Sequence, residues 1–301
     1  MSSNLLSLPS ELLSQILARL PMRSLLKFAE TSRRAHFLAN ANLHTLSLGI
    51  HTLSGSSEVS KHPYDVWLRI PDAHTYDYMT LLSFQSALLR SILLRHDSVL
   101  QTVTLSIWTL TTKTAEAIAR LIALRSLSIR IEGGAYGLNV PRSHMAIERV
   151  EQRKAWSLLS SKAVWRSRLY TLRLENADLN TEQLVDMLRE TRCCAELWLS
   201  WCRFVGKELW KFLGEWRGNR ALRVLGLAEC GGVLSEATLG VIGGLGGLQS
   251  LNLYDCKGLD SSLFEACNRD IWHIVELISP KMIGDGKDMI IEVDPEYEQE
   301  M

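Results

Sequence analysis

The sequence has no excess of charge of either sign. Lysine plus arginine and aspartate plus glutamate each number 33 among 301 residues, so the formal net charge is zero at neutral pH. A chain without net charge has no general electrostatic attraction for nucleic acid or for an acidic membrane surface. We therefore expect neither nucleic acid nor a membrane among its partners.

Cysteine is scarce, and its spacing argues against two classes of protein. The six cysteines form no Cys-x-x-Cys metal pair and no disulfide framework. No basic stretch precedes an apolar run at the N-terminus, so we predict no signal peptide. The uncharged stretch at 237–254 is broken by several glycines, which argues against a membrane span. Reduced thiols are usual in the cytosol and nucleus, so we expect a cytoplasmic or nuclear protein.

The motifs of the common enzyme classes are missing as well. The sequence has no Gly-x-Ser-x-Gly elbow, no His-Glu-x-x-His pair, no phosphate-binding glycine loop that ends in Lys-Ser/Thr, and no dinucleotide fingerprint. The eight histidines are scattered, and no two stand at helical ligand spacing. We therefore predict that the protein is not an enzyme and has no catalytic residue, metal site or cofactor.

What the sequence does contain is a repeat. From residue 43 onward the pattern Leu-x-x-Leu-x-Leu recurs, and the last leucines of its clearest copies are separated by 25, 28, 26 and 24 residues. Between the copies, apolar residues recur at helical spacing. The pattern resembles the leucine-rich repeat, which implies a short strand that lines a horseshoe and a helix packed behind it. The clearest copies end at Leu174, Leu199, Leu227, Leu253 and Leu277, and weaker ones end at Leu48, Leu105 and Ile129.

Three of the cysteines keep the same place in successive repeats. Cys202, Cys230 and Cys256 each stand three residues after the last leucine of their copy. This resembles the cysteine-containing class of the repeat, in which the side chain fills the turn that leaves the strand. A small buried thiol with weak donor character suits such a turn. Because stacking aligns the three thiols in any case, their alignment does not indicate a metal site.

The N-terminus predicts a separate small module. Two prolines bracket a leucine-rich helix, and two further short helices follow before residue 45. Three helices in about forty residues form a marginal core, so the wide apolar stripe of the first helix needs a partner to cover it. The pattern consists of Leu8-Pro9-x-Glu11-Leu12-Leu13, Ile16-Leu17, Leu20-Pro21, Leu25-Leu26 and Ser32-Arg33.

These residues resemble the F-box, by which substrate receptors dock onto the adaptor of SCF-type ubiquitin ligases. The resemblance implies a SKP-family adaptor of cullin-RING ligases as a partner, bound by an apolar helical face. An ordinary helical cap on a larger domain is the alternative that we rank second. The adaptor-binding residues that the resemblance implies are Leu8, Pro9, Glu11, Leu12, Leu13, Ile16, Leu17, Leu20, Leu25 and Leu26.

Together these features predict an α/β fold. We expect a three-helix F-box at 1–45, followed at 46–284 by a leucine-rich-repeat solenoid with parallel strands on the concave side and helices on the convex side. The period breaks between residues 48 and 105 and between residues 129 and 174, which predicts inserts near 51–66 and 132–145. Within the first break, an extra strand is also expected at 67–70. The segment 285–301 is expected to be an acidic tail.

The predicted strands offer a surface for a target protein. Alternate strand residues point to opposite faces, so the residues that flank the leucines face the concave side. Tryptophan, tyrosine and arginine, the residue types enriched at interface hot spots, gather there in the middle of the array. Trp198 either anchors a target or packs on a neighbouring strand. The target site predicted from these positions comprises Arg130, Arg173, Glu175, Trp198 and Tyr254.

The arginines of this site suggest a target segment that is acidic or phosphorylated. The basic stretch from Arg142 to Arg168 is expected to border the same site. Two functions fit the sequence. In the first, the chain is the substrate-recognition subunit of an SCF-type E3 ubiquitin ligase, with the F-box on the adaptor and the repeats on a target. In the second, it is a leucine-rich-repeat interaction scaffold without a ligase role.

Overall fold

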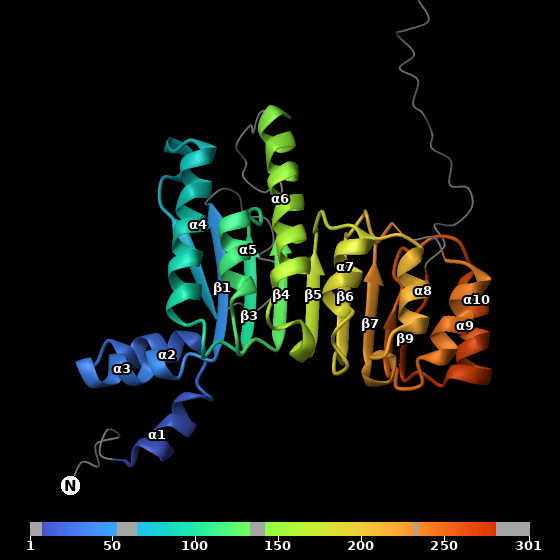
Figure 1. Cartoon of the computed structure of the whole chain (residues 1–301), viewed down its shortest axis with the longest axis horizontal. Coiled ribbons are helices and arrows are strands. Elements are labelled where there is room, and N and C mark those ends of the chain that lie inside the picture. The colour runs from blue at the N-terminus through green and yellow to red at the C-terminus, as the bar shows by residue number, and fades with distance from the viewer. Residues whose placement is uncertain (1–7, 53–64, 133–141, 232–233, 281–301) are drawn as a thin grey trace, which may run out of the picture.

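The chain folds into a small helical module and a long α/β region with a parallel sheet (Figure 1). The computed structural model describes residues 8–52, 65–132, 142–231 and 234–280. The predicted order, three N-terminal helices followed by strands and helices in alternation, is confirmed. Among the described helices, none combines the length and the apolar character that a bilayer span requires.

The N-terminal module consists of α1 (Ser10–Leu17), α2 (Met22–Ala29) and α3 (Arg33–Ala41). Pro9 and Pro21 each precede a helix in an extended conformation, where the N–H that proline lacks is not needed. Ser32 caps α3, because its hydroxyl accepts a hydrogen bond from the N–H of Ala35 at 3.1 Å. The prolines and the serine therefore set the three helix starts.

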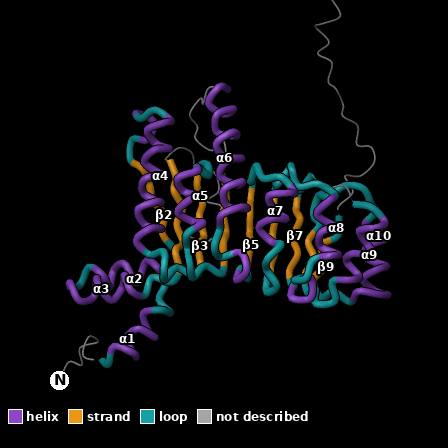
Figure 2. Tube along the Cα trace, in the orientation of Figure 1, coloured by secondary structure: helices purple, strands orange, loops and turns teal. Residues whose placement is uncertain are grey.

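All described strands belong to one parallel sheet in the order β2-β1-β3-β4-β5-β6-β7-β8-β9. From β3 to β9, the strands lie side by side in chain order. β1 lies between β2 and β3, so the chain crosses from one side of β1 to the other between these two strands. The strands form a single layer (Figure 2). They are β1 (Thr45–Thr52), β2 (Val66–Ile70), β3 (Thr102–Ile107), β4 (Ser126–Ile131), β5 (Thr171–Glu175), β6 (Glu196–Ser200), β7 (Val224–Ala228), β8 (Ser250–Asn252) and β9 (Glu276–Ile278).

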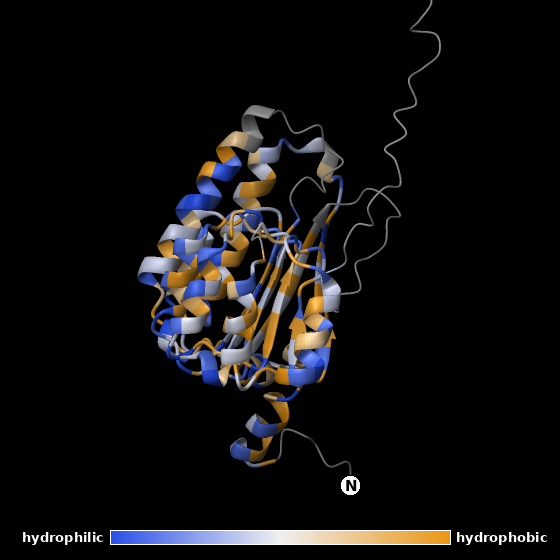
Figure 3. Cartoon of the chain, turned by 90° about the vertical axis from the view of Figure 1, so that its right-hand side faces the viewer, coloured by the Kyte–Doolittle hydropathy of each residue, from blue (hydrophilic) through white to orange (hydrophobic). Residues whose placement is uncertain are grey.

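The helices that connect the strands lie on one face of the sheet (Figure 3). Neighbouring helices pack on one another in chain order, α5 on α6 and α6 on α7. We call the other side of the sheet the open face. The helices are α4 (Tyr78–Arg95), α5 (Thr112–Ala119), α6 (Arg142–Lys162), α7 (Thr181–Leu188), α8 (Glu208–Glu215), α9 (Glu236–Gly244) and α10 (Ser261–Cys267). Short 3-10 turns occur at Ala73–Thr75, Arg166–Arg168 and Asn219–Ala221, and a π turn at Asn268–Trp272.

The leucines of the repeat pattern form the core between sheet and helices. Leu174, Leu199 and Leu227 stand opposite one another in adjacent strands, and each is buried. A fully buried leucine side chain contributes roughly 1.5–3 kcal/mol relative to an exposed one. Because the same positions recur in every unit, the buried leucines form a continuous stack along the sheet.

The predicted extra strand exists, but in an unexpected place. Val66–Ile70 forms β2, which pairs in parallel with the outer side of β1 instead of continuing the array. The strand therefore closes the end of the sheet nearest the N-terminal module. The remainder of the predicted inserts, at 53–64 and 133–141, and the predicted acidic tail lie outside the described residues, whereas 142–145 belong to α6.

A left-handed residue follows each of the regular strands β5 to β8. Asn176, Trp201, Glu229 and Asp255 have φ between 52° and 58° and occupy the same place in successive units. The N–H groups of the first three donate to a carbonyl at or just after the end of the next strand, at 2.8–3.1 Å. These bonds offset the cost of a conformation that is unfavourable for a bulky residue such as tryptophan.

The next residue in three of these turns is a cysteine, and it lies where the sequence predicts. Each thiol donates to the carbonyl of the last leucine in the strand of the previous unit. The bonds run from Cys202 to Leu174 at 3.7 Å, from Cys230 to Leu199 at 3.6 Å and from Cys256 to Leu227 at 2.7 Å. Cys202 and Cys256 are buried. Burial raises the pKa of the Cys256 thiol to about 12, so this thiol stays protonated at neutral pH.

Candidate functional site

The predicted adaptor-binding residues divide into a buried and an exposed set. Leu13, Leu17 and Leu25 are buried in the core of the chain, so they hold the helices together and are not available to a partner. Leu8 and Leu20 are partly buried, whereas Pro9 and Glu11 are exposed. Sequence periodicity identified the apolar stripe but could not tell which part of it the chain itself covers.

The exposed set forms the candidate contact surface. Leu12 and Ile16 lie one helical turn apart on α1 and are 49% and 40% exposed, and Leu26 on α2 is similarly exposed. Phe37 on α3 is 73% exposed, although the sequence analysis did not include it in the site. Large apolar side chains that a small module leaves exposed are typical of an interaction surface. We call Leu12, Ile16, Leu26 and Phe37 the exposed apolar set.

One aspartate ties the helical module to the sheet. The N–H of Met22, at the start of α2, donates to Asp65 Oδ2 at 3.3 Å, while the N–H of Asp65 donates to the Ser47 hydroxyl on β1 at 3.1 Å. A carboxylate at a helix N-terminus also complements the helix dipole. Asp65 therefore links the N-terminal module to the first strands, and no local motif in the sequence pointed to it.

Four of the five predicted target-binding residues come together on the open face. Arg130, Arg173, Glu175 and Trp198 lie on the adjacent strands β4, β5 and β6 and line a groove of about 700 Å³. Tyr254 follows β8 and lies outside this groove, although its side chain is exposed. The structure thus brings together the predicted centre of the site and separates it from Tyr254.

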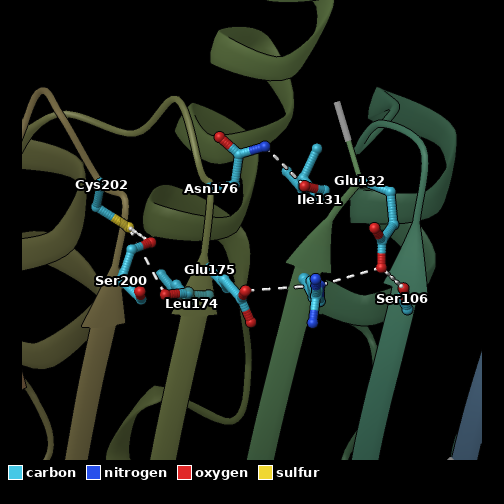
Figure 4. A network of polar contacts seen from close by, with 9 residues as sticks. Ser106, Ile131, Glu132, Leu174, Glu175, Asn176, Ser200 and Cys202 are labelled. Carbon is cyan, nitrogen blue, oxygen red and sulfur yellow. Dashed lines mark hydrogen bonds and ion pairs between the residues drawn. The ribbon is translucent and has the colours of Figure 1, made fainter. Parts of the chain in front are cut away.

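Acidic neighbours neutralise both arginines of this groove. Arg130 Nε lies 3.0 Å from Glu132 and 3.5 Å from Glu175, and Glu132 also accepts a hydrogen bond of 2.5 Å from the hydroxyl of Ser106 (Figure 4). Arg173 is paired with Glu196 on β6. The arginines are therefore engaged within the sheet before any target binds.

The charge of the open face argues against the expected acidic target. Arg130 and Arg173 face four carboxylates on this side of the sheet. Removing an arginine from its carboxylate would leave that carboxylate unpaired, which offsets the gain from a new anionic partner. The open face thus gives no support to an acidic or phosphorylated target there. The carboxylates are Glu132, Glu175, Glu196 and Glu276.

The basic stretch of α6 does not border this groove. Most of the stretch Arg142–Arg168 does not lie beside the target site as expected, because α6 packs between α5 and α7 on the helix-covered face (Figures 1 and 3). Only its end, at Arg168, lines a groove that shares Ser126 with the groove of the open face. Two arginines of α6 have partners on the helix-covered face: Arg149 lies 3.9 Å from Asp178, and Arg153 stacks over the ring of Phe204. Arg166, in the turn after α6, lies 3.0 Å from Glu190.

Trp198 packs on a neighbouring strand and remains partly exposed. Its ring lies over Gly226 on β7, so closely that a Cβ atom at Gly226 would come within 2.3 Å of it. Glycine at this position leaves space for the ring to lie flat along the sheet. The packing of Trp198 on a neighbouring strand is therefore observed. The ring also lines the groove, and its role as a target anchor stays a prediction.

A second tryptophan repeats this arrangement at the other end of the sheet. Trp67 on β2 lies over Gly49 on β1, where an added Cβ atom would come within 2.7 Å of its ring. Trp67 is not among the predicted site residues, because the repeat period does not reveal the parallel pairing of β2 with β1. The Trp–Gly spacing in neighbouring strands is the signal that could have found it.

The described residues contain no group of three or more histidine, cysteine or acidic side chains close enough to hold a metal ion. The aligned cysteines instead hydrogen-bond to backbone carbonyls within their turns.

Comparison with known proteins identifies the N-terminal module. A family model described as the F-box domain matches residues 5–43, which include all of α1, α2 and α3. No curated protein matches the chain. The match agrees with the residues that carry the sequence resemblance. The chain therefore carries an F-box domain at its N-terminus, and this domain implies a role in binding the adaptor of SCF-type ubiquitin ligases.

Proposed function

We propose that this chain is the substrate-recognition subunit of an SCF-type E3 ubiquitin ligase. Its F-box binds a SKP-family adaptor, and its sheet region, built from leucine-rich repeats, binds the target protein. Other subunits transfer ubiquitin, so this chain contributes proximity and no chemical group. The single observation that carries the proposal is the F-box match at residues 5–43, which coincides with the three helices that bear the exposed apolar set.

The physical support for adaptor binding is the unburied apolar surface of the module. Leu12, Ile16, Leu26 and Phe37 expose large side chains to water in the isolated chain. Covering apolar surface contributes about 25 cal/mol per Å², and helix-in-groove recognition typically uses residues one helical turn apart, as Leu12 and Ile16 are. A partner that supplies an apolar groove would gain this energy.

The open face supplies the target site in this proposal. The groove over β4, β5 and β6 has a flat aromatic platform, Trp198, within a border of charged residues. This arrangement matches the anatomy of interfaces, in which an aromatic anchor is surrounded by a polar rim. Asp65 hydrogen-bonds to both the F-box and the first strand, so it links the adaptor-binding module to the sheet that carries the groove.

The adaptor-binding part is tested with two matched isoleucine variants. Ile16→Glu places a charge in the exposed apolar set, whereas Ile147→Glu places one on α6, where Ile147 is 59% exposed. We expect Ile16→Glu to lose capture of a purified SKP-family adaptor and Ile147→Glu to retain it, with circular dichroism reporting that both fold. Full adaptor capture by Ile16→Glu would contradict the proposed surface and favour the scaffold function.

The target-binding part is tested with Trp198→Ala. We expect this variant to keep the adaptor and to lose a specific subset of the proteins that co-purify with the wild type, measured by quantitative mass spectrometry. If the variant unfolds, or if it captures the same proteins in the same amounts, Trp198 is a packing residue and the target binds elsewhere.

A further inference from the structure

The balanced composition of the chain conceals a strong separation of charge. In a parallel sheet, every connection that leads from a helix into a strand reaches the same edge, which we call the entry edge. Along this edge, from β4 to β7, eight arginines are exposed, of which Arg120 pairs with Glu116 and Arg189 with Asp186. The other six are Arg125, Arg168, Arg192, Arg217, Arg220 and Arg223.

The backbone places these six arginines on one continuous rim. The carbonyl of Arg125 accepts hydrogen bonds from the N–H groups of Tyr170 and Thr171, at 2.7 and 3.1 Å. Further along, the N–H of Arg223, before β7, donates to the carbonyl of Ala195, before β6, at 2.8 Å. Between them, the N–H of Ala195 donates to the carbonyl of Tyr170 at 2.8 Å. The connections before β4, β5, β6 and β7 therefore lie side by side, and their arginines line one border of the sheet. We call this border the arginine edge.

No described acid neutralises the arginine edge. The connections at 120–125, 163–170, 189–195 and 216–223 contain a single acidic residue, Glu190, which is already paired with Arg166 at 3.0 Å. Within the described part of the chain, none of the six arginines forms an ion pair with an acid. This distinguishes them from Arg130 and Arg173 on the open face, whose carboxylate partners lie on the same sheet.

The arginine edge contains a groove between the starts of β3, β4 and β5. The groove has a volume of about 550 Å³, and its lining includes Arg125, Arg168, Ser126, Tyr170 and Cys193. Two guanidinium groups with neighbouring hydroxyl donors suit carboxylates, which guanidinium binds in bidentate fashion. Ser126 also lines the groove of the open face, so the two grooves adjoin.

The acidic complement of this edge is present in the same chain. Residues 281–301 contain seven acids and two lysines, so residues 1–280 keep 31 basic against 26 acidic side chains, a formal net charge of +5. The tail and the remainder of the chain therefore carry equal and opposite charges. The seven acids are Asp285, Asp288, Glu292, Asp294, Glu296, Glu298 and Glu300.

We propose that the acidic C-terminal tail docks in cis on the arginine edge, with its carboxylates in the groove lined by Arg125 and Arg168. The tail follows β9, four strands from β5. Four strand spacings and the length of one strand amount to about 35 Å, whereas the 21 residues of 281–301 span up to about 70 Å when extended. The tail is thus long enough to reach the groove.

A tail bound beside Ser126 would lie at the border of the groove that holds Trp198. Exposed charges attract one another less as salt is added, so the docked state weakens with ionic strength. The inference does not depend on the F-box binding a ligase.

The exposed thiol of Cys193 provides a native reporter at the groove. We would measure the rate at which maleimide labels Cys193 in the full chain, resolved by peptide mass spectrometry, at low and high salt. A tail-neutral variant carries Glu292→Gln, Asp294→Asn, Glu296→Gln and Glu298→Gln. We expect the wild type to react several-fold more slowly than this variant at low salt, and the difference to vanish at high salt. Lys257→Glu, at the opposite edge, is the control for a change of charge elsewhere.

A second measurement separates docking from a purely electrostatic effect on the thiol. Gln299→Cys keeps every tail charge, and under mild oxidation we expect its new thiol to form an intramolecular disulfide with Cys193. The additional changes Arg125→Glu and Arg168→Glu should abolish that disulfide. The proposal is overturned if Cys193 labels equally in the wild type and the tail-neutral variant. It is also overturned if the thiol introduced at position 299 couples to glutathione but not to Cys193, or couples to Cys193 only between molecules in a concentration-dependent way.

Discussion

The two halves of the sheet differ in the lengths of their strands and helices and in the residues that hold their turns. In the first half, β1 to β4 contain 5–8 residues, and α4 and α6 contain 18 and 21. In the second half, β5 to β9 contain 3–5 residues and α7 to α10 contain 7–9. Among the described residues of the two halves, the row of left-handed turn residues and the aligned cysteines belong to the second. The first half therefore needs another way to hold its turns.

Buried glutamines take the place of the cysteines in the first half. Gln85 on α4 accepts a hydrogen bond from the N–H of Trp108 at 2.8 Å and donates to the carbonyl of Thr109 at 2.9 Å. Gln152 on α6 donates to the Thr109 hydroxyl at 3.3 Å and accepts from the N–H of Asp178 at 2.6 Å. In the second half, cysteines of the turns themselves donate to carbonyls of the adjacent unit. In the first half, Thr109 depends instead on glutamines of two long helices.

The largest effect that this comparison predicts is at Gln85. In Gln85→Ala the N–H of Trp108 and the carbonyl of Thr109 lose their partners inside the core. An unsatisfied buried polar group costs roughly 1–3 kcal/mol, so we expect the free energy of unfolding to fall by about 3 kcal/mol. Urea denaturation measures it, with Gln101→Ala, at an exposed site, as the control. A loss no larger than that of the control would show that Gln85 does not hold the turn.

A smaller loss is expected where a tryptophan lies over a glycine. In Gly226→Ala the new Cβ atom displaces the ring of Trp198, and Gly49→Ala does the same to Trp67 in the first half. Overpacking costs about 1–3 kcal/mol, and we expect about 1–2 because both rings can move toward solvent. Red-shifted tryptophan fluorescence would report the displacement. Gly240→Ala, where no atom lies within 4 Å of the added Cβ, should leave the emission unchanged.

Replacing a turn cysteine of the second half by alanine should lower the free energy of unfolding less than replacing Gln85 does. Cys202→Ala removes one weak thiol hydrogen bond and a small buried volume, so we expect a loss of about 1 kcal/mol in the free energy of unfolding. Cys193→Ala, at an exposed thiol, is the matched control. If Cys202→Ala proved as costly as Gln85→Ala, the two kinds of turn would be equally dependent on their buried anchor, contrary to the comparison.

The smallest predicted effect depends on pH. Burial raises the pKa of the Glu148 carboxyl, to which the hydroxyl of Tyr78 donates a hydrogen bond. The folded state therefore holds this proton at higher pH than the unfolded state, and stability falls as the pH rises from the ordinary glutamate pKa through the raised value. Glu148→Gln cannot ionise, so it should flatten this part of the stability curve.

The gain from Glu148→Gln at neutral pH should not exceed about 0.5 kcal/mol, because the site is partly solvated. Urea denaturation at several pH values measures it. A steeper loss of stability with rising pH in the variant than in the wild type would contradict the assignment.

The sequence predicted the second half well for a physical reason. There, each turn bonds to the adjacent units in the same way, so the leucine period alone locates the strands and the rows of the open face. It also found Trp198 and the arginines, because alternate strand residues share a face. In the F-box, the proline positions and the apolar period located the helices, but not which leucines the chain buries.

The features that the sequence did not predict depend on contacts between residues that lie far apart along the chain. The outward position of β2 and the capping of α2 by Asp65 join segments that are separate in the sequence, more than forty residues apart in the case of Met22 and Asp65. The ion pairs of Arg130 with Glu175 and of Arg173 with Glu196 also come from neighbouring strands, and they changed the expected charge of the target site. Neither repeat period nor residue type reveals such partners.

The most direct test of the central claim is calorimetric titration of a purified SKP-family adaptor into the purified full chain. The account predicts a saturable 1:1 complex through the exposed apolar set of the F-box, with the same affinity in Trp198→Ala, because that ring lies on the sheet. No heat of binding, together with separate elution of the two proteins, would contradict the claim that this chain is the receptor subunit of a ligase.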